Sequence, residues 1–447
     1  MSHFFLPPRA TSVAPGALIP HAVLAALILA HAPVHAAGVS FQDVWRTVSD
    51  RSHAGAAATA RAEAAQVASS RASRHWLPRI WLGAQAVRTD EAGQNFFGLM
   101  GQRSVTAADF SPDQLNRPGT QTFTRGAVGL DLPLWEGGGG VARAEGSERV
   151  QKAVEAEASA ARARQFAEVA RSYGALLALR EESAELQDLH RSVTGVIARY
   201  AVGSRSNPVG YSGLLGLRTL SNRLEGLLAE NSSRGAGHLA ALAEMGMGTT
   251  DWEPVRQGVS DFAATWFPAG NEGESPALAA ERARAEAARS LVAMERSKFL
   301  PRLGLFAEQS VVSGRRDTEN ARAIGAYLSW NLFHPTEIGA VKEARLLASA
   351  AEHSAQARAE SERAERKSLT AGAGALRKNL ALVEESLRLL TEQTRTAEGL
   401  FRNGSINALQ LVEALSRRAD LIVSATEARL ALLRTESERA LKENFTP

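Results

Sequence analysis

The chain has 447 residues, a formal net charge of +3 and no cysteine. The lack of cysteine excludes disulfides, thiolate metal sites, a cysteine nucleophile and an acylated lipoprotein cysteine. Because lysine and arginine are interleaved with glutamate, the charge pattern gives no reason to expect nucleic acid as a partner. Aromatic residues make up 6% of the chain, and alanine, glutamate, arginine and leucine dominate, a composition typical of long helices.

The first 36 residues have the pattern of an export signal. Arg9 is the only charged residue before Ala36, residues 17–30 are largely apolar, and residues 34–36 place small side chains at the cleavage positions. The apolar run is shorter than the about 20 residues that a membrane-spanning helix needs. We therefore predict a signal peptide over residues 1–36 and an exported mature chain.

The same order of motifs occurs twice in the chain. His-Trp-Leu-Pro-Arg at residues 75–79 returns as Lys-Phe-Leu-Pro-Arg at 298–302, and Arg-Tyr-Ala-Val-Gly-Ser at 199–204 returns as Leu-Phe-Arg-Asn-Gly-Ser at 400–405. The distance between the copies, about 200 residues, is far above the 20–50 residues of a solenoid repeat. We therefore predict a duplicated unit of the size of a domain.

The first copy is expected over residues 37–250 and opens with an alanine-rich helix at 41–76, which a proline ends. A β-hairpin at 79–134 follows, because residues 126–134 alternate between apolar and small or polar side chains, the period of a strand. The segment between the strands, 89–121, is polar and lacks a clear period, which predicts an exposed loop.

A helical hairpin over residues 141–247 completes the first copy. Its first helix would be roughly 90 Å long at 1.5 Å per residue. The far end of that helix carries apolar residues at alternating spacings of three and four, which predict coiled-coil packing against a neighbour. We place the turn of the hairpin at residues 201–210, where Gly203 can end the helix. The apolar seam is formed by Leu186, Leu189, Val193, Val196 and Tyr200.

Residues 251–275, rich in tryptophan, glycine and proline, are expected to be an irregular equatorial connection between the copies. The second copy, 276–447, repeats the order of elements: a helix, a β-hairpin at 302–333, and a helical hairpin at 336–444 that turns at 402–406. Its seam has the same spacing as the first and comprises Leu387, Leu390, Thr394, Ala397 and Phe401. The many Glu/Arg pairs, such as those between Glu360 and Arg366, are typical of solvated helix faces.

The two hairpins give four strands of about ten residues, each with one apolar face. Strands of 9–11 residues match a tilted bilayer crossing, and an apolar outer face with a polar inner one is the pattern of a transmembrane barrel. Open edges are excluded in lipid, and four strands cannot close a barrel, so other copies of the chain must complete it. Two copies would give eight strands filled by side chains, whereas three would give twelve and a lumen. The alternative is a small soluble sheet capped by helices. The expected lipid-facing residues are Val128, Leu130, Leu132, Ala326, Leu328 and Trp330.

The order of these motifs resembles the outer-membrane efflux proteins, the TolC-like family, over essentially all of the mature chain. The resemblance rests on residues 75–79 and 298–302, on Leu-Pro-Leu-Trp-Glu-Gly at 132–137, and on aromatic-x-x-Gly-Ser turns at 200–204 and 401–405. It implies a mixed α/β membrane protein: a homotrimer with a 12-stranded β-barrel in the outer membrane, continued by an α-helical barrel in the periplasm. Such proteins are passive exit ducts of tripartite efflux or type I secretion systems. They are joined to an inner-membrane transporter by a periplasmic adaptor protein.

The resemblance also implies which residues form the periplasmic end. Family members often place acidic residues six and nine positions after the second glycine of the turns, as a ring at the aperture. Counted from Gly404, these positions are Gln410 and Glu413, so only the second is acidic, and the positions after Gly203 carry no acid. The turns themselves would dock the adaptor. The residues implied there are Tyr200, Gly203, Ser204, Arg205, Phe401, Gly404 and Ser405.

Other classes of function find less support in the sequence. Gly137 to Gly140 precede a helix but lack the Lys-Ser/Thr of a phosphate loop. The histidines of the mature chain show no i,i+3 or i,i+4 pair, and no nucleophile has a plausible base, so we expect no metal, no cofactor and no enzyme. A periplasmic adaptor also uses long helical hairpins, but would carry one hairpin flanked by β-rich domains. A cell-surface or tail-fibre coiled coil would not be interrupted by proline-bounded strands.

Overall fold

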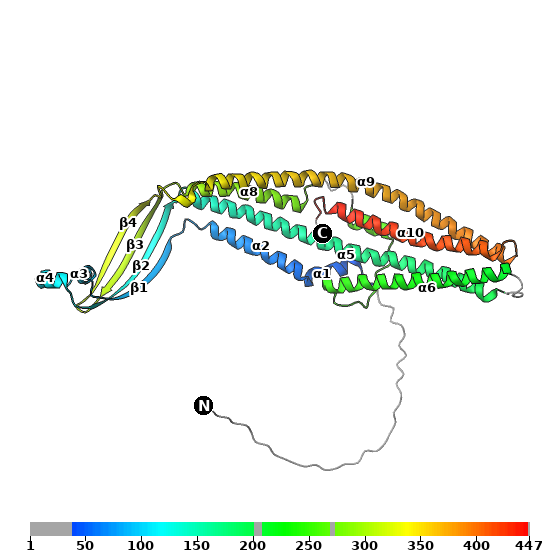
Figure 1. Ribbon diagram of the computed structural model, residues 1–447, viewed down its shortest axis with the longest axis horizontal. Helices are drawn as coiled ribbons and strands as arrows, with labels where there is room; N and C mark the ends of the chain where they lie inside the picture. The colour runs from blue at the N-terminus through cyan, green and yellow to red at the C-terminus, as the bar shows by residue number, and fades with distance from the viewer. Residues whose placement is uncertain (1–37, 201–207, 269–272, 446–447) are drawn as a thin grey trace, which may run out of the picture. The chain divides into compact units, whose positions relative to one another are not determined.

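A computed structural model describes residues 38–200, 208–268 and 273–445, which belong to one compact unit. The signal peptide predicted over residues 1–36 lies outside the described residues. Within the described part, long helices run from one end of a four-stranded sheet (Figure 1). None of the described helices combines the length and the hydropathy that a membrane crossing requires.

The chain begins with two helices where the sequence predicted one. Helix α1 (Phe41–Arg51) and helix α2 (His53–Ala72) are separated by Ser52. The backbone of Ser52 is extended, its N–H donates to the carbonyl of Val48, and its hydroxyl accepts from the N–H of Gly55. One serine therefore ends the first helix and caps the second, as its short hydroxyl side chain allows.

The sheet consists of β1 (Arg79–Thr89), β2 (Gln121–Trp135), β3 (Arg302–Ser313) and β4 (Thr318–Ser329). All neighbours are antiparallel and the order is β1-β2-β3-β4, so the hairpins of the two copies join through β2 and β3. Strands β1 and β4 each lack a partner on their outer side within the described sheet. The second hairpin is shorter than the predicted 302–333, because β4 ends at Ser329.

The segment between β1 and β2, predicted to be an exposed loop, is folded. It contains α3 (Ala92–Gly101), a 3-10 turn (Ala107–Phe110) and α4 (Pro112–Asn116), and lies beyond the strand ends in Figure 1. Asn95 and Leu99 are buried, and the Asn95 side-chain amide donates to the carbonyls of Thr89 and Gly119, both at 3.3 Å. These bonds tie the two ends of the segment together. We call residues 90–120 the cap.

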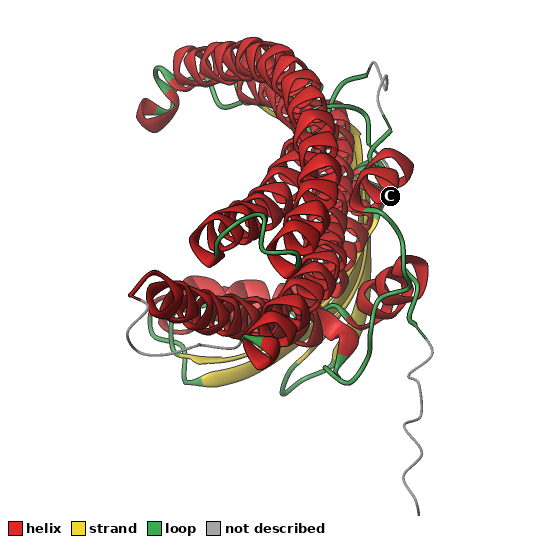
Figure 2. Cartoon of the chain, turned by 90° about the vertical axis from the view of Figure 1, so that its right-hand side faces the viewer, coloured by secondary structure: helices red, strands yellow, loops and turns green. Residues whose placement is uncertain are grey.

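Five further helices, four of them long, make up most of the rest of the chain. Two contain 61 and 63 residues and follow the two hairpins; two others return along them after the turns; and one precedes β3. At 1.5 Å per residue the longest are roughly 90–95 Å long. In the end-on view of Figure 2 the helices lie along an arc. Their bounds are α5 Gly139–Arg199, α6 Pro208–Leu242 (extended by a π-helical turn, Ala243–Met247), α8 Pro276–Ser297, α9 Ala340–Arg402 (preceded by a 3-10 turn, Pro335–Glu337) and α10 Ala408–Ala440.

The apolar seams of the two copies meet in one core near the turns. Leu186, Leu189 and Val193 of α5 are fully buried and share this cluster with Leu387 of α9. Helices α6 and α10 close it with leucines at helical spacing. The neighbour that the heptad pattern required is thus supplied within the chain. The contributions of α6 and α10 include Leu217, Leu220, Leu224, Leu411 and Leu415.

A second core lies where the start of the chain, its end and the connection between the copies come together. The connection, predicted to be irregular, contains α7 (Val259–Trp266). Phe41 of α1 packs edge-on against Phe166 of α5 and Phe262 of α7, with ring centroids 5.3 and 5.2 Å apart. Aromatic rings of α1, α5 and α7 therefore pack together in this core, which we call the equatorial core.

Candidate functional site

One face of the sheet is apolar and exposed. The register places Ile80, Leu130, Ala307 and Ile324 in one row across the four strands. Ile80 is 73% exposed and Ile324 is 88% exposed. We call this the apolar face; toward the cap it is interrupted by Arg322, whose guanidinium donates to Gln309. Of the residues predicted to face lipid, Val128, Leu130, Leu132, Ala326 and Leu328 lie on this face, and Trp330 lies just past the end of β4.

The opposite face carries most of the charged residues of the sheet. Arg125 and Glu308 form an ion pair at 2.5 Å across β2 and β3. Aromatic rings on this side lie close to glycines of the neighbouring strand: a Cβ on Gly129 would come within 2.4 Å of the Trp81 ring. Glycine at this position is therefore required for the close approach of the ring. We call this the polar face.

Aromatic side chains gather where the strands join the helices. Trp76 is 62% exposed, Trp330 55% and Phe333 76%, and Trp135 lies at the corresponding end of β2. The indole N–H of Trp330 donates to the carbonyl of Phe299 at 3.1 Å. Tryptophan rings are enriched where protein crosses from lipid to water, since they are apolar with a polar N–H edge. Sequence reasoning did not use this cluster as a site, although the aromatic residues at the strand ends were a signal.

At the far end of the helices the two copies are joined by an aromatic pair. The rings of Tyr200 and Phe401 stack with centroids 5.8 Å apart and planes 7° from parallel. The Tyr200 hydroxyl donates to the carbonyl of Gly210 at 2.8 Å. Gly404 has a φ of +72°, a conformation that favours glycine, and it reverses the chain between α9 and α10. Ser405 is exposed beside it. The predicted residues Gly203, Ser204 and Arg205 lie outside the described residues.

The two residues predicted at the aperture have different roles. The Gln410 side chain is part of a capping box: its carbonyl accepts from the N–H of Asn407, whose own side chain accepts from the N–H of Gln410. Gln410 therefore caps α10 instead of extending away from it. Glu413 is exposed, but its carboxylate is bonded to Arg417 at 2.8 Å, one turn along the helix. Arg417 was not among the predicted site residues, although its i,i+4 spacing from Glu413 is visible in the sequence.

A charged groove lies between α5, α9 and α10, in a cavity of about 630 Å³. The guanidinium of Arg429 lies 3.3 Å from Glu181 and 3.2 Å from Glu384. Burial raises the pKa of the Glu181 and Glu185 carboxyls, an effect that Arg429 partly opposes. Since acids and bases alternate around it, the groove is an ion-pair network between helices and not a site for one sign of charge. The charged residues of its lining are Glu185, Glu384, Arg388, Glu392, Arg395, Arg418 and Arg429, and Glu181 lies beside it.

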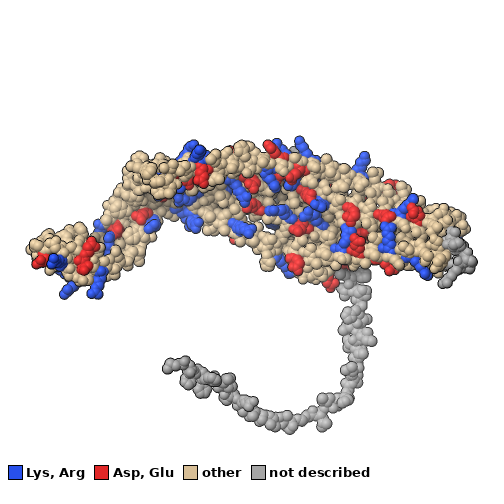
Figure 3. Space-filling model, viewed as in Figure 1, with Lys and Arg blue, Asp and Glu red and all other residues tan. Residues whose placement is uncertain are grey.

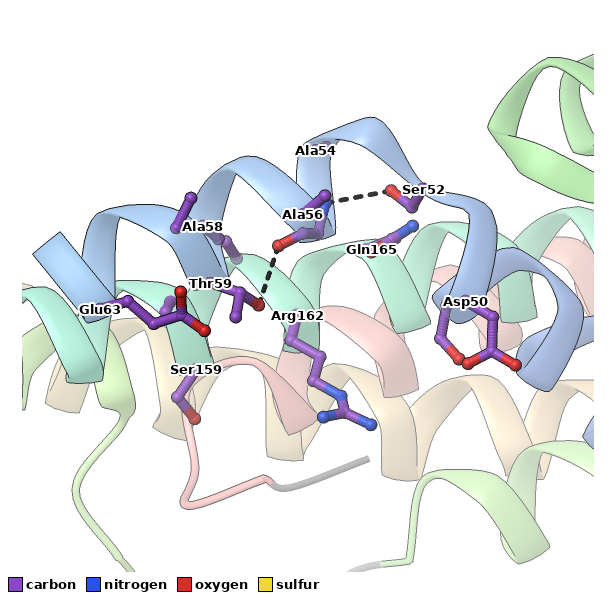
Figure 4. Close-up of a pocket in the computed structure, with 15 residues that line it drawn as sticks. Asp50, Ser52, Ala54, Ala56, Ala58, Thr59, Glu63, Ser159, Arg162 and Gln165 are labelled. Carbon is purple, nitrogen blue, oxygen red and sulfur yellow. Dashed lines mark hydrogen bonds between the residues drawn. The ribbon is translucent and has the colours of Figure 1, made fainter.

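A cavity of about 790 Å³ lies between α1, α2 and α5 and is lined mainly by alanines and short polar side chains (Figure 4). The Ser52 hydroxyl caps α2, and the Thr59 hydroxyl bonds to a carbonyl of its own helix. None of the serine and threonine hydroxyls in this lining is hydrogen-bonded to a carboxylate, and the lining contains no histidine. Among the described residues, no group of three or more His, Asp or Glu side chains is placed to hold a metal ion.

Charges on the helical part are of both signs. Figure 3 shows lysine and arginine interspersed with aspartate and glutamate along the helices, with no patch of one sign on the face in view. Surface ion pairs of this kind each contribute little to stability.

The fold matches those of solved outer-membrane channels. CusC gives a TM-score of 0.75 at 13% identity over 92% of this chain and 93% of that one. The CmeC outer membrane channel of Campylobacter jejuni gives 0.73 at 16% over 91% and 86%, and the outer membrane protein VceC of Vibrio cholerae gives 0.70 at 18% over 91% and 96%. No protein-family model and no curated protein sequence matches the chain. The resemblance to the TolC-like channels is thereby confirmed for the fold.

Proposed function

We propose that the mature chain is an outer-membrane exit duct, which passively conducts substrate from an inner-membrane transporter and a periplasmic adaptor to the exterior. The observation that carries this is the four-stranded sheet, with an exposed apolar face, a charged opposite face and two edges that no described strand pairs. An exposed apolar surface of this extent is costly in water but matches lipid. The sheet would lie in the outer membrane and the long helices would extend into the periplasm.

Three copies complete the duct. Each contributes four strands, and β1 of one copy would pair with β4 of the next, giving a 12-stranded barrel with the polar face inside. The arc of helices seen in Figure 2 is the shape that one part of a helical tube needs. Two copies would give eight strands, too few for an open lumen.

The helical tips would form the periplasmic end, where Tyr200, Gly203, Ser204, Arg205, Phe401, Gly404 and Ser405 would dock the adaptor. The stack of Tyr200 on Phe401 supports this, because it holds the tips of both copies of the repeat together. The adaptor alternative is not favoured, since the strands preceding the two helical hairpins form one shared sheet instead of separate β-rich domains.

The oligomeric state tests this proposal directly. The mature chain is expected to extract from outer membranes only with detergent and to have the mass of a trimer, because lipid cannot satisfy the backbone groups of two open edges. Native mass spectrometry of the detergent-extracted protein measures its oligomeric state. Recording in planar bilayers shows whether the extracted protein forms channels. A monodisperse monomer in detergent-free buffer would refute the proposal.

Charge selectivity tests the placement of Glu413 at the aperture. In a ring of three such carboxylates, each carboxylate would attract a trivalent cation about 6 Å away by roughly 2 kcal/mol, even at water-like dielectric. Glu413→Gln is therefore expected to weaken block by a trivalent cation from the periplasmic side at least about ten-fold. Arg417→Gln, which frees the same carboxylate, is expected to strengthen the block. An unchanged block in both variants would show that this pair is not at the aperture.

A further inference from the structure

The cap rests on the polar face of the sheet. A Cβ on Gly98 would lie 2.4 Å from the ring of Phe123, and a Cβ on Gly101 would lie 3.1 Å from the side chain of Val312. Val312 pairs with Arg125, and Phe123 lies two residues from Arg125 on the same strand, so both belong to the polar face. Helix α3 therefore lies against the side of the sheet that carries the charges, at the end remote from the long helices.

The cap is fixed in this position by the second hairpin. The carboxylate of Asp109 receives two bonds from the guanidinium of Arg316, at 2.5 and 2.6 Å. The fully buried carbonyl of the Gln102 side chain accepts from the N–H groups of Arg316 and Asp317 at 3.1 and 3.0 Å. Bidentate arginine–carboxylate pairs are strong and directional. The cap is thus a folded element clasped to the turn between β3 and β4.

The cap carries exposed apolar side chains that nothing in the described chain covers. Phe97 is 70% exposed, Phe110 59% and Met100 51%. Beneath them Phe96 packs edge-on against Phe110, with centroids 5.5 Å apart. Soluble surfaces rarely keep such a group of large apolar side chains in water without a partner.

We propose that the caps of three copies meet over the outer mouth of the duct and form an apolar constriction there. This inference rests on the proposed function. When the β1 edge of one copy pairs with the β4 edge of the next around a common axis, the polar face becomes the inside of the barrel. Because each cap lies on the polar face, each cap is then directed inward. The partner that covers Phe97, Met100 and Phe110 is then the cap of a second copy. Narrow apolar rings lose their water, so this constriction would oppose hydrated ions and favour amphiphilic organic cargo.

Cross-linking tests whether the caps meet. The chain contains no cysteine, so a single introduced thiol reacts without background. Trimeric Phe97→Cys protein is expected to give a covalent dimer with a short bismaleimide or on oxidation, since a disulfide requires Cα atoms within about 7 Å. The matched control is Ile324→Cys, on the exposed apolar face, which should give none. Phe110→Cys serves as a second position.

Conductance gives an independent measurement. The double variant Phe97→Ser, Phe110→Ser is expected to raise single-channel conductance roughly two-fold or more, because a polar ring holds water. Phe333→Ser, which removes a comparably exposed ring at the other end of the sheet, is expected to leave conductance unchanged. Trimeric channels with no cross-link at either position and unchanged conductance would overturn the constriction while leaving the duct intact. Absence of trimers and channels in the unmodified protein would overturn the proposed function itself.

Discussion

Ile324→Arg is expected to lower the free energy of unfolding in lipid vesicles by about 2–4 kcal/mol. Ile324 is 88% exposed and lies in the central row of the apolar face, level with Leu130. In the proposed barrel an arginine there would lie near the middle of the bilayer, where its guanidinium finds neither water nor a partner. Equilibrium unfolding in urea, followed by tryptophan fluorescence, measures the change.

The control is the adjacent residue on the same strand. Ala323→Arg introduces the same side chain on the polar face, where Ala323 is paired with Glu308. It is expected to cost less than about 1 kcal/mol, because the new charge lies in water beside a carboxylate. Equal losses from the two substitutions would contradict the assignment of the two faces.

Arg439→Met is expected to cost about 3–5 kcal/mol, the range for breaking a buried ion pair by removing one partner. Arg439 is 2% exposed and bonds to Glu436 and to Glu443, both of which are buried. Its guanidinium also donates to the carbonyls of Phe267 and Pro268, which ties the connection between the copies to the end of α10. The substitution would leave the Glu443 carboxylate buried and unpaired. Urea unfolding followed by circular dichroism of the detergent-solubilised protein measures the loss.

A surface arginine on the same helix provides the comparison. Arg434 forms a similar i,i+4 pair with Glu438, but its side chain is 74% exposed. Arg434→Met is expected to change the free energy of unfolding by less than about 1 kcal/mol, since water replaces the lost partner. If both variants lose the same amount, the network around Arg439 does not hold the equatorial core together.

Some helical glutamates and arginines are buried, although the sequence predicted that they would be exposed to solvent. The Glu/Arg pattern predicted solvated faces, yet Glu362 is 1% exposed and accepts from the hydroxyl of Ser275 at 2.7 Å. The pattern of charges along a helix is the same whether the charged side of the helix faces water or another helix. Burial was decided by a contact between residues that lie 87 positions apart in the sequence.

The sequence by itself determined the features that depend on neighbours along the chain. Alternation over residues 126–134 predicted a strand with an apolar face, the heptad spacing from Leu186 to Tyr200 predicted a packed seam, and Gly404 predicted a turn. Side-chain direction has a period of two in strands and about 3.6 in helices, so these faces can be read from the order of residues alone. The repetition of the motifs then indicated the TolC-like fold.

Only the tertiary structure decided how distant segments meet. It joined the two hairpins through β2 and β3, placed the connection containing α7 in the equatorial core, and folded the expected exposed loop into a cap. The cap is held by Asp109 and Arg316, which are 207 residues apart. Such contacts leave no period in the sequence, because their geometry exists only after the chain between them has folded.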